Sequence, residues 1–172
     1  MLAYLRRHVV VDRGRPMADD AWPFAAADML ITNGCGPALE HLVFALCDPA
    51  DAVLTPAPIY AGFTLDVGGR PQARLITVPT VVDARPRLEV GRLDTALRAC
   101  ERQGTTVRAL LLSHPYNPLG TCLSRDELEE IGIEFRGDGG RQSILQSLTA
   151  FDLTAREFPQ SSQKPVLITL DN

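Results

Sequence analysis

The fold expected for this chain rests on the stretch Val107-Arg-Ala-Leu-Leu-Leu-Ser113 and the segment after it, His114-Pro-Tyr-Asn-Pro-Leu-Gly-Thr121. The first part is an almost continuous apolar run, which predicts a strand buried on both faces of a parallel sheet. The second part has two prolines, which fix the path of a loop leaving that strand. Ligands of open α/β sheets bind at the edge where such loops emerge, so Asn117 is a candidate ligand contact. An ordinary Asn-Pro turn is the alternative interpretation.

Strand-like and helix-like segments alternate around this stretch. Apolar runs typical of strands lie at 29–32, 52–55 and 74–79, and apolar residues at helical spacing lie at 39–46 and 91–102. Gly104 is placed to end the second helix, and Ser124 with Glu127 has the spacing of a capping box that opens another. The pattern predicts an α/β fold, with a mostly parallel sheet flanked by helices.

The two ends of the chain give weaker signals. Residues 1–24 predict a short N-terminal helix, with Leu2, Leu5 and Val9 on one face, followed by a loop that includes 13–20. Residues 25–135 carry the strong strand and helix pattern. Residues 136–172 form a divergent tail, in which 144–151 suggests a weak helix face and 166–170 suggests a terminal strand.

Composition excludes several classes of protein. The 172 residues carry a net charge of -4, which offers no basic stripe for nucleic acid. The apolar runs are too short for a membrane helix or a secretory signal, so a cytoplasmic location is expected. Four scattered cysteines without a CxxC pair indicate reduced thiols, with no metal site and no disulfide framework. Sixteen of the 17 basic residues are arginine, and Lys164 is the single lysine.

Three positions could contact a ligand besides Asn117. Gly34-Cys35-Gly36 precedes an apolar-periodic helix, where free backbone N–H groups and the helix dipole favour a phosphate. A plain turn is the alternative there. Tyr60 follows the strand at 52–55 and offers a ring for stacking, although many tyrosines only pack. His114 could be a base, but the sequence shows no nucleophile with an orienting group beside it, so a turn histidine is the preferred interpretation.

Four segments in this order and spacing resemble the large domain of a class I/II pyridoxal-phosphate (PLP) dependent aminotransferase, and the branch they look nearest to contains 1-aminocyclopropane-1-carboxylate synthase. The segments are 31–40, 48–51, 56–63 and 113–121. The resemblance implies a partial PLP-transferase-like domain that is incomplete on its C-terminal side. It also implies an amino acid substrate, transamination or elimination chemistry, and a role in biosynthesis, and it allows for a homodimer.

The resemblance also implies roles for individual residues. Cys35 and Gly36 stand where the family holds the cofactor phosphate, Tyr60 matches the aromatic residue that stacks on the pyridine ring, and Asn117 matches the amide that contacts the ring 3-oxygen. Two features depart from the family pattern. Pro37 replaces a residue that is commonly glycine, and Cys35-Gly36 lacks the hydroxyl that the family often places there.

The lysine that forms the Schiff base in this family, its aspartate for the pyridine nitrogen and its arginine for the substrate normally lie beyond residue 133. Lys164 comes too early and lacks the family's glycine-rich context, and Asp171 ends an apolar run but follows an insertion. The catalytic residues are therefore unassigned. Three hypotheses follow: a truncated aminotransferase-like protein, a non-catalytic remnant, and a Rossmann-like nucleotide binder, which the missing GxGxxG fingerprint disfavours.

Overall fold

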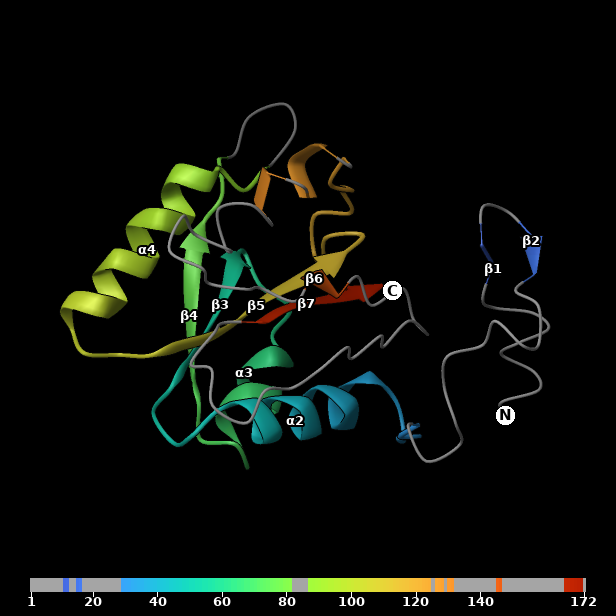
Figure 1. The fold of residues 1–172 in the computed structure, drawn as a ribbon, viewed down its shortest axis with the longest axis horizontal. Coiled ribbons are helices and arrows are strands. Elements are labelled where there is room, and N and C mark those ends of the chain that lie inside the picture. The colour runs from blue at the N-terminus through green and yellow to red at the C-terminus, as the bar shows by residue number, and fades with distance from the viewer. Residues whose placement is uncertain are drawn as a thin grey trace.

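The computed structural model describes residues 11–12, 15–16, 29–81, 87–124, 126–128, 130–131, 145–146 and 166–171. Its main feature is a five-stranded sheet in which all neighbouring strands are parallel, in the order β4-β3-β5-β7-β6 (Figure 1). The strands are β3 (Ala52–Ala57), β4 (Arg74–Pro79), β5 (Val107–His114), β6 (Leu145–Gln146) and β7 (Val166–Asp171). The α/β class expected from the alternating pattern is confirmed.

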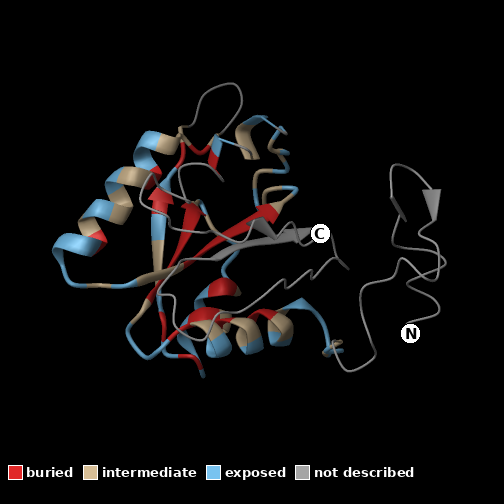
Figure 2. Ribbon diagram, in the orientation of Figure 1, coloured by how far each residue is buried: buried red, intermediate tan, exposed pale blue. Residues whose placement is uncertain are grey.

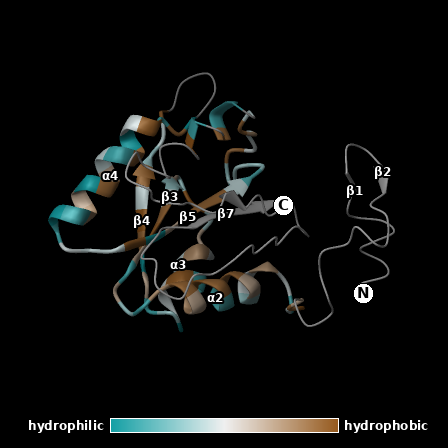
Figure 3. Cartoon of the chain, in the orientation of Figure 1, coloured by the Kyte–Doolittle hydropathy of each residue, from teal (hydrophilic) through white to brown (hydrophobic). Residues whose placement is uncertain are grey.

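Helices cover both faces of this sheet. Helix α4 (Val90–Arg102) lies on one face, and α2 (Cys35–Leu46) and α3 (Phe63–Gly68) lie on the other (Figure 1). The central strands are the most completely buried part of the described chain (Figure 2), and they are also strongly hydrophobic (Figure 3). This burial on two faces is the reason for the almost continuous apolar run of β5.

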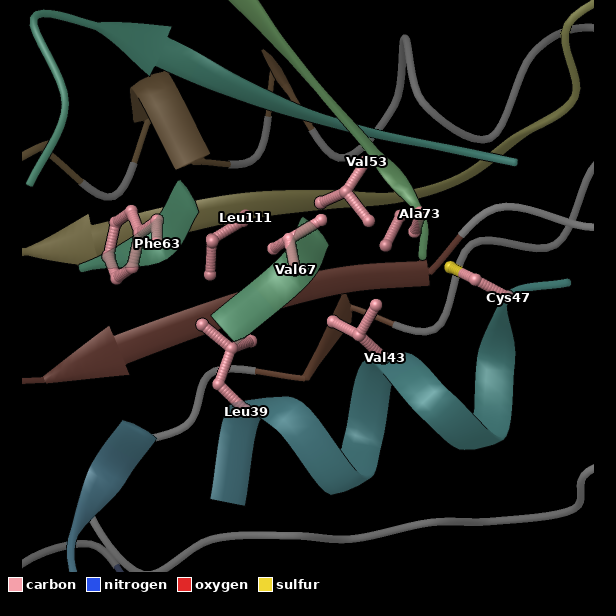
Figure 4. Close-up of a cluster of buried hydrophobic side chains, with 9 residues drawn as sticks. Leu39, Val43, Cys47, Val53, Phe63, Val67, Ala73 and Leu111 are labelled. Atoms are coloured by element: carbon pink, nitrogen blue, oxygen red, sulfur yellow. The ribbon is translucent and has the colours of Figure 1, made fainter. Parts of the chain in front are cut away.

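The face under α2 and α3 packs into one hydrophobic cluster (Figure 4). Successive residues of a strand point to opposite faces, so Val53, Ala109 and Leu111 all face this cluster. Leu39 and Val43 of α2 lie four residues apart, one helical turn, and both are buried against the sheet. Burying a side chain of this size stabilises the fold by about 2 kcal/mol.

The opposite face packs against α4 with the alternate residues of the same strands. Leu54, Leu110 and Leu112 belong to this second cluster, together with Leu93 of α4. Helix α4 ends as the sequence predicts, because Gly104 takes a positive φ of 67° and the Thr105 N–H returns to the Cys100 carbonyl at 2.9 Å. Gly104 thus ends the helix that connects β4 to β5, because glycine readily adopts this left-handed conformation.

The predicted capping box is confirmed. The Glu127 N–H donates to Ser124 Oγ at 3.2 Å, and the Ser124 N–H donates to Glu127 Oε2 at 2.6 Å. Helical residues follow at 126–128 and 130–131, and Ile131 is buried in the cluster under α4. The strand predicted at 166–170 is also confirmed, as β7.

Three local expectations are wrong. Residues 29–32 form no strand: Leu30 and Ile31 are exposed, since this short apolar run pairs with no strand of the sheet. Within the expected loop at 13–20, β2 (Arg15–Pro16) pairs antiparallel with β1 (Val11–Asp12). Within the weak helix face expected at 144–151, Leu145–Gln146 form β6, which pairs in parallel with β7, and the rest of that segment lies outside the described residues. The expected helix with Leu2, Leu5 and Val9 lies outside the described residues.

Candidate functional site

The order of the strands creates a site at the edge of the sheet where β3 and β5 end. From β3 the chain crosses to β4 on one side, and from β4 it returns to β5 on the other side of β3. Ligands of open α/β sheets bind at such a reversal, beyond the carboxyl ends of the strands. Residues 58–62 and 115–121 emerge there, and they contain Tyr60 and Asn117.

Tyr60 presents its ring at the surface of the loop after β3. Half of the residue is exposed (50%), and its ring meets Phe63 edge-on, with 5.5 Å between the ring centres and an interplanar angle of 81°. Gly62 permits this position, because a Cβ there would lie 2.4 Å from the Tyr60 ring. The ring is therefore fixed on one edge and open elsewhere, which suits stacking on a planar ligand.

Asn117 lies in a loop that is closed on itself. Its N–H donates to Ser113 Oγ at 3.3 Å, and the same hydroxyl donates to the Pro115 carbonyl at 3.1 Å. Gly120, with a φ of 70°, donates its N–H to the Tyr116 carbonyl at 2.6 Å, so the loop turns back in a conformation that favours glycine. The backbone of Asn117 is thus held from both sides, and its side chain is half-buried.

His114 has a structural contact at this edge. The Leu123 N–H donates to His114 Nε2 at 3.1 Å, which fixes the segment after the loop against the end of β5. The interpretation of His114 as a turn histidine fits this contact better than a role as a base does.

The two loops are joined by Tyr116. Its phenol donates to the Pro58 carbonyl at 2.8 Å, across 58 residues of sequence. Next to this contact, Thr80 Oγ1 donates to the Ala57 carbonyl at 2.7 Å, so the end of β4 holds the end of β3. The loop of Tyr60 and the loop of Asn117 therefore lie side by side at one edge of the sheet.

The beginning of α2 offers backbone N–H groups. Gly34 precedes the helix with a φ of 95°, and within the described part of the chain no side chain caps this end. Cys35 is exposed and Gly36 is half-buried. Uncapped N–H groups at a helix start carry partial positive charge and favour a phosphate.

A carboxylate lies beside this helix start. A Cβ on Gly36 would be 3.2 Å from Asp66 Oδ1, so the glycine makes room for the acid. Burial, and then the charge of Glu40, raises the pKa of Asp66. Burial, and then the charge of Asp66, raises the pKa of the Cys35 thiol, which keeps that thiol protonated. The ionised carboxylate of Asp66 would repel an anion bound at this helix start. Binding of an anion there would therefore favour the protonated form of Asp66.

Contacts connect the predicted positions in two steps. Gly36 lies against Asp66 of α3, and α3 begins at Phe63, which touches the Tyr60 ring. Tyr116 and Asp66 are not among the positions predicted from the sequence. Tyr116 could be noticed as the aromatic residue inside the double-proline loop, but a bond to a carbonyl 58 residues earlier leaves no local signal.

Asp171 ends at the same edge as Asn117. Strand β7 pairs with β5 in parallel, and Asp171 stands opposite His114 in the register. The acid thus ends the strand next to the one that leads to Asn117. Lys164 lies outside the described residues.

The described residues contain neither a membrane-spanning helix nor a metal-binding cluster. No helix among them is long and apolar enough to span a bilayer. They also contain no group of three or more His, Cys, Asp or Glu side chains arranged to hold a metal ion.

Solved structures and curated relatives place this arrangement among known proteins. The PLP-bound C-S lyase of Staphylococcus hominis has the same fold over 67% of this chain and 28% of its own, with a TM-score of 0.57 and 18% identity. Cystalysin of Treponema denticola, which contains pyridoxal 5'-phosphate, matches 59% of this chain and 24% of its own, with a TM-score of 0.50 and 24% identity. The fold is that of a PLP-dependent transferase domain, present in part.

The family model "Aminotransferase class I and II" matches residues 18–134, and the chain belongs to this family. It is 33% identical over 115 residues to 1-aminocyclopropane-1-carboxylate synthase 6 of Oryza sativa. It is 37% identical over 157 residues to the "Probable inactive 1-aminocyclopropane-1-carboxylate synthase-like protein 2" of Homo sapiens. These matches cover 67% and 81% of this chain but only 21% and 28% of the relatives. The chain therefore spans about a quarter of the length of the curated proteins that it matches.

Proposed function

We propose that this protein holds pyridoxal 5'-phosphate in the crevice between the ends of β3 and β5, as part of an aminotransferase-like protein that acts on an amino acid. One observation carries the proposal. The loops with Tyr60 and Asn117 follow neighbouring parallel strands at the point where the strand order reverses, and one hydrogen bond joins them. In such a crevice a planar ligand meets groups from both loops.

The beginning of α2 is proposed to bind the phosphate. Among the described residues, no side chain caps the N–H groups at this helix start. Gly36 has no side chain, and a Cβ there would lie 3.2 Å from Asp66 Oδ1. Burial, and then the charge of Glu40, raises the pKa of Asp66, which weakens the opposition of this carboxylate to a phosphate. Family membership also supports the proposal.

The two loops are proposed to orient the ring. The exposed face of Tyr60 would stack on the pyridine, and the Asn117 amide would donate to the oxygen at its 3-position. The cofactor, when bound, supplies the electron sink that stabilises negative charge at the α-carbon of an amino acid. The backbone of Asp171 ends β7 beside β5, at the edge of the sheet proposed to hold the cofactor.

A second function is supported by a different observation. The sequence has a single lysine, Lys164, and the name of the human relative contains the word inactive. A binding-competent but non-catalytic remnant would retain the cofactor site and lack a proton carrier at the α-carbon. Transamination or elimination, a biosynthetic role, a cytoplasmic location and a homodimer stay predictions.

Binding of pyridoxamine 5'-phosphate, which has no aldehyde, tests the site itself. Isothermal titration of the purified chain would give a Kd, and Tyr60→Ala and Asn117→Ala should each raise it about tenfold, since one stacked or hydrogen-bonded contact contributes about 1–2 kcal/mol. Phe44→Ala is the matched control, because Phe44 is an exposed aromatic side chain of α2 that contacts Arg70 instead. Equal loss in all three variants, or no binding by the wild type, would contradict the proposal.

Borohydride trapping with the aldehyde form separates the two functions. Adduct on Lys164, found by peptide mass spectrometry and absent in Lys164→Arg, would favour the enzyme. Binding of pyridoxamine 5'-phosphate without any adduct on Lys164 would favour the non-catalytic remnant.

A further inference from the structure

We propose that Tyr116 is a positioning residue, whose phenol holds the loop of Tyr60 against the loop of Asn117. The inference rests on the proposed function for its consequence, because these two loops are the ones proposed to orient the cofactor ring. The contact joins Tyr116 to Pro58, both of which the structure describes, and it forms without a ligand. It joins the residue before Asn117 to a carbonyl two residues before Tyr60.

The position of the acceptor explains why this bond controls Tyr60. Pro58 is the first residue after β3, and its carbonyl accepts the Tyr116 phenol at 2.8 Å. The other end of the loop is fixed by α3, where the Phe63 N–H donates to the Tyr60 carbonyl at 3.1 Å. Tyr116 therefore fixes the near end of a short segment whose far end is already held. Both ends must be fixed for the exposed ring to keep one orientation.

The donor is itself well anchored. The Tyr116 N–H donates to the Thr121 carbonyl, and the Tyr116 carbonyl accepts the Gly120 N–H, both at 2.6 Å. The side chain is half-buried, and burial raises the pKa of its phenol to about 12, although the nearby Thr80 hydroxyl lowers it. The phenol thus remains a donor throughout the physiological pH range.

A simple packing role is the competing explanation, and the hydroxyl distinguishes the two. Tyr116→Phe keeps the ring and removes the hydroxyl, with its bond to the Pro58 carbonyl and its contact with Thr80. If the ring packs and nothing more, this variant should behave as the wild type. If the bond positions the loop, the variant should loosen residues 59–62 while the sheet stays unchanged.

The first measurement is amide hydrogen exchange of the ligand-free chain. Tyr116→Phe should raise the exchange rates of the Phe63, Thr64 and Leu65 amides, which donate to the carbonyls of residues 60–62, about 3- to 10-fold, the range given by the loss of one net hydrogen bond. Exchange in β3 and α4 should not change, which serves as the internal control. Unchanged exchange at 63–65 would overturn the proposal.

The second measurement is a double-mutant cycle on the Kd for pyridoxamine 5'-phosphate. Tyr116→Phe should raise the Kd about 3- to 10-fold in the wild-type background and by less than twofold in Tyr60→Ala, because its effect passes through Tyr60. Full additivity would refute a positioning role through Tyr60. If the wild type binds nothing while exchange still rises in Tyr116→Phe, the loop contact stands and the cofactor proposal fails.

Discussion

Replacing Asp51 with alanine removes the acceptor that joins the beginnings of β3 and β5. Asp51 Oδ2 accepts from Arg108 Nε at 2.7 Å and from the Asp48 N–H at 3.0 Å. The side chains of Arg108 and Asp51 are only 21% and 12% exposed, so water replaces these contacts incompletely. A charged hydrogen bond contributes about 1.5–3 kcal/mol and a backbone one about 1 kcal/mol. We therefore expect Asp51→Ala to lower the free energy of unfolding by about 2–4 kcal/mol.

Urea denaturation followed by circular dichroism measures this cost, and Arg108→Met provides the second side of a double-mutant cycle. Methionine keeps much of the aliphatic stem and removes the charge, so we expect a loss of about 1–2 kcal/mol and a coupling of about 1–2 kcal/mol with Asp51→Ala. The exposed pair of Arg98 and Asp94, 2.7 Å apart on α4, is the control and should contribute below about 1 kcal/mol. The reasoning fails if Asp51→Ala costs no more than Asp94→Ala, or if the cycle shows no coupling.

Three further predictions use the same assay or mass spectrometry. Leu111→Ala should cost about 2–5 kcal/mol, because Leu111 is fully buried under α2 and α3, and a cost below about 1 kcal/mol would contradict that burial. Ser124→Ala should cost about 1 kcal/mol by opening the capping box, whereas an unchanged urea midpoint would argue against it. Burial raises the pKa of Cys47 from 9.0 to about 12. Iodoacetamide should therefore modify the exposed Cys35 before the buried Cys47, and stability should fall as pH rises from about 9 toward 12, since the unfolded thiol ionises earlier; equal modification of Cys35 and Cys47 in the folded chain would contradict this placement.

The central part of the fold could be predicted from sequence because burial on two faces leaves a plain signal. The run at 107–113 and the run at 74–79 became β5 and β4 at nearly the expected bounds. The brief run at 29–32 misled, since three apolar residues and a threonine predict a strand only if a neighbouring strand offers hydrogen bonds. Helix α3 was missed because its six residues include a threonine, an aspartate and a glycine, and packing of Phe63 and Val67 determines it.

The candidate site was predictable only as separate pieces. The double-proline loop and the glycines at the start of α2 are local features, and they point to Asn117 and to Cys35-Gly36 as contacts of the proposed ligand. The contacts that assemble the pieces join distant parts of the sequence. Asp66 reaches the space beside Gly36, and Tyr116 reaches Pro58. Such pairings follow from the strand order, which periodicity and spacing do not specify.

The ion pair of Asp51 and Arg108 lies where β3 and β5 begin, and the proposed ligand contacts lie where the same strands end. A change at one end need not disturb the other, because the rigid strands keep the two ends apart. Lineages that drift in loops 58–62 and 115–121 can therefore acquire new ligand preferences without losing the scaffold. Other loops could likewise be grafted onto the ends of these strands without changing the ion pair at their beginnings.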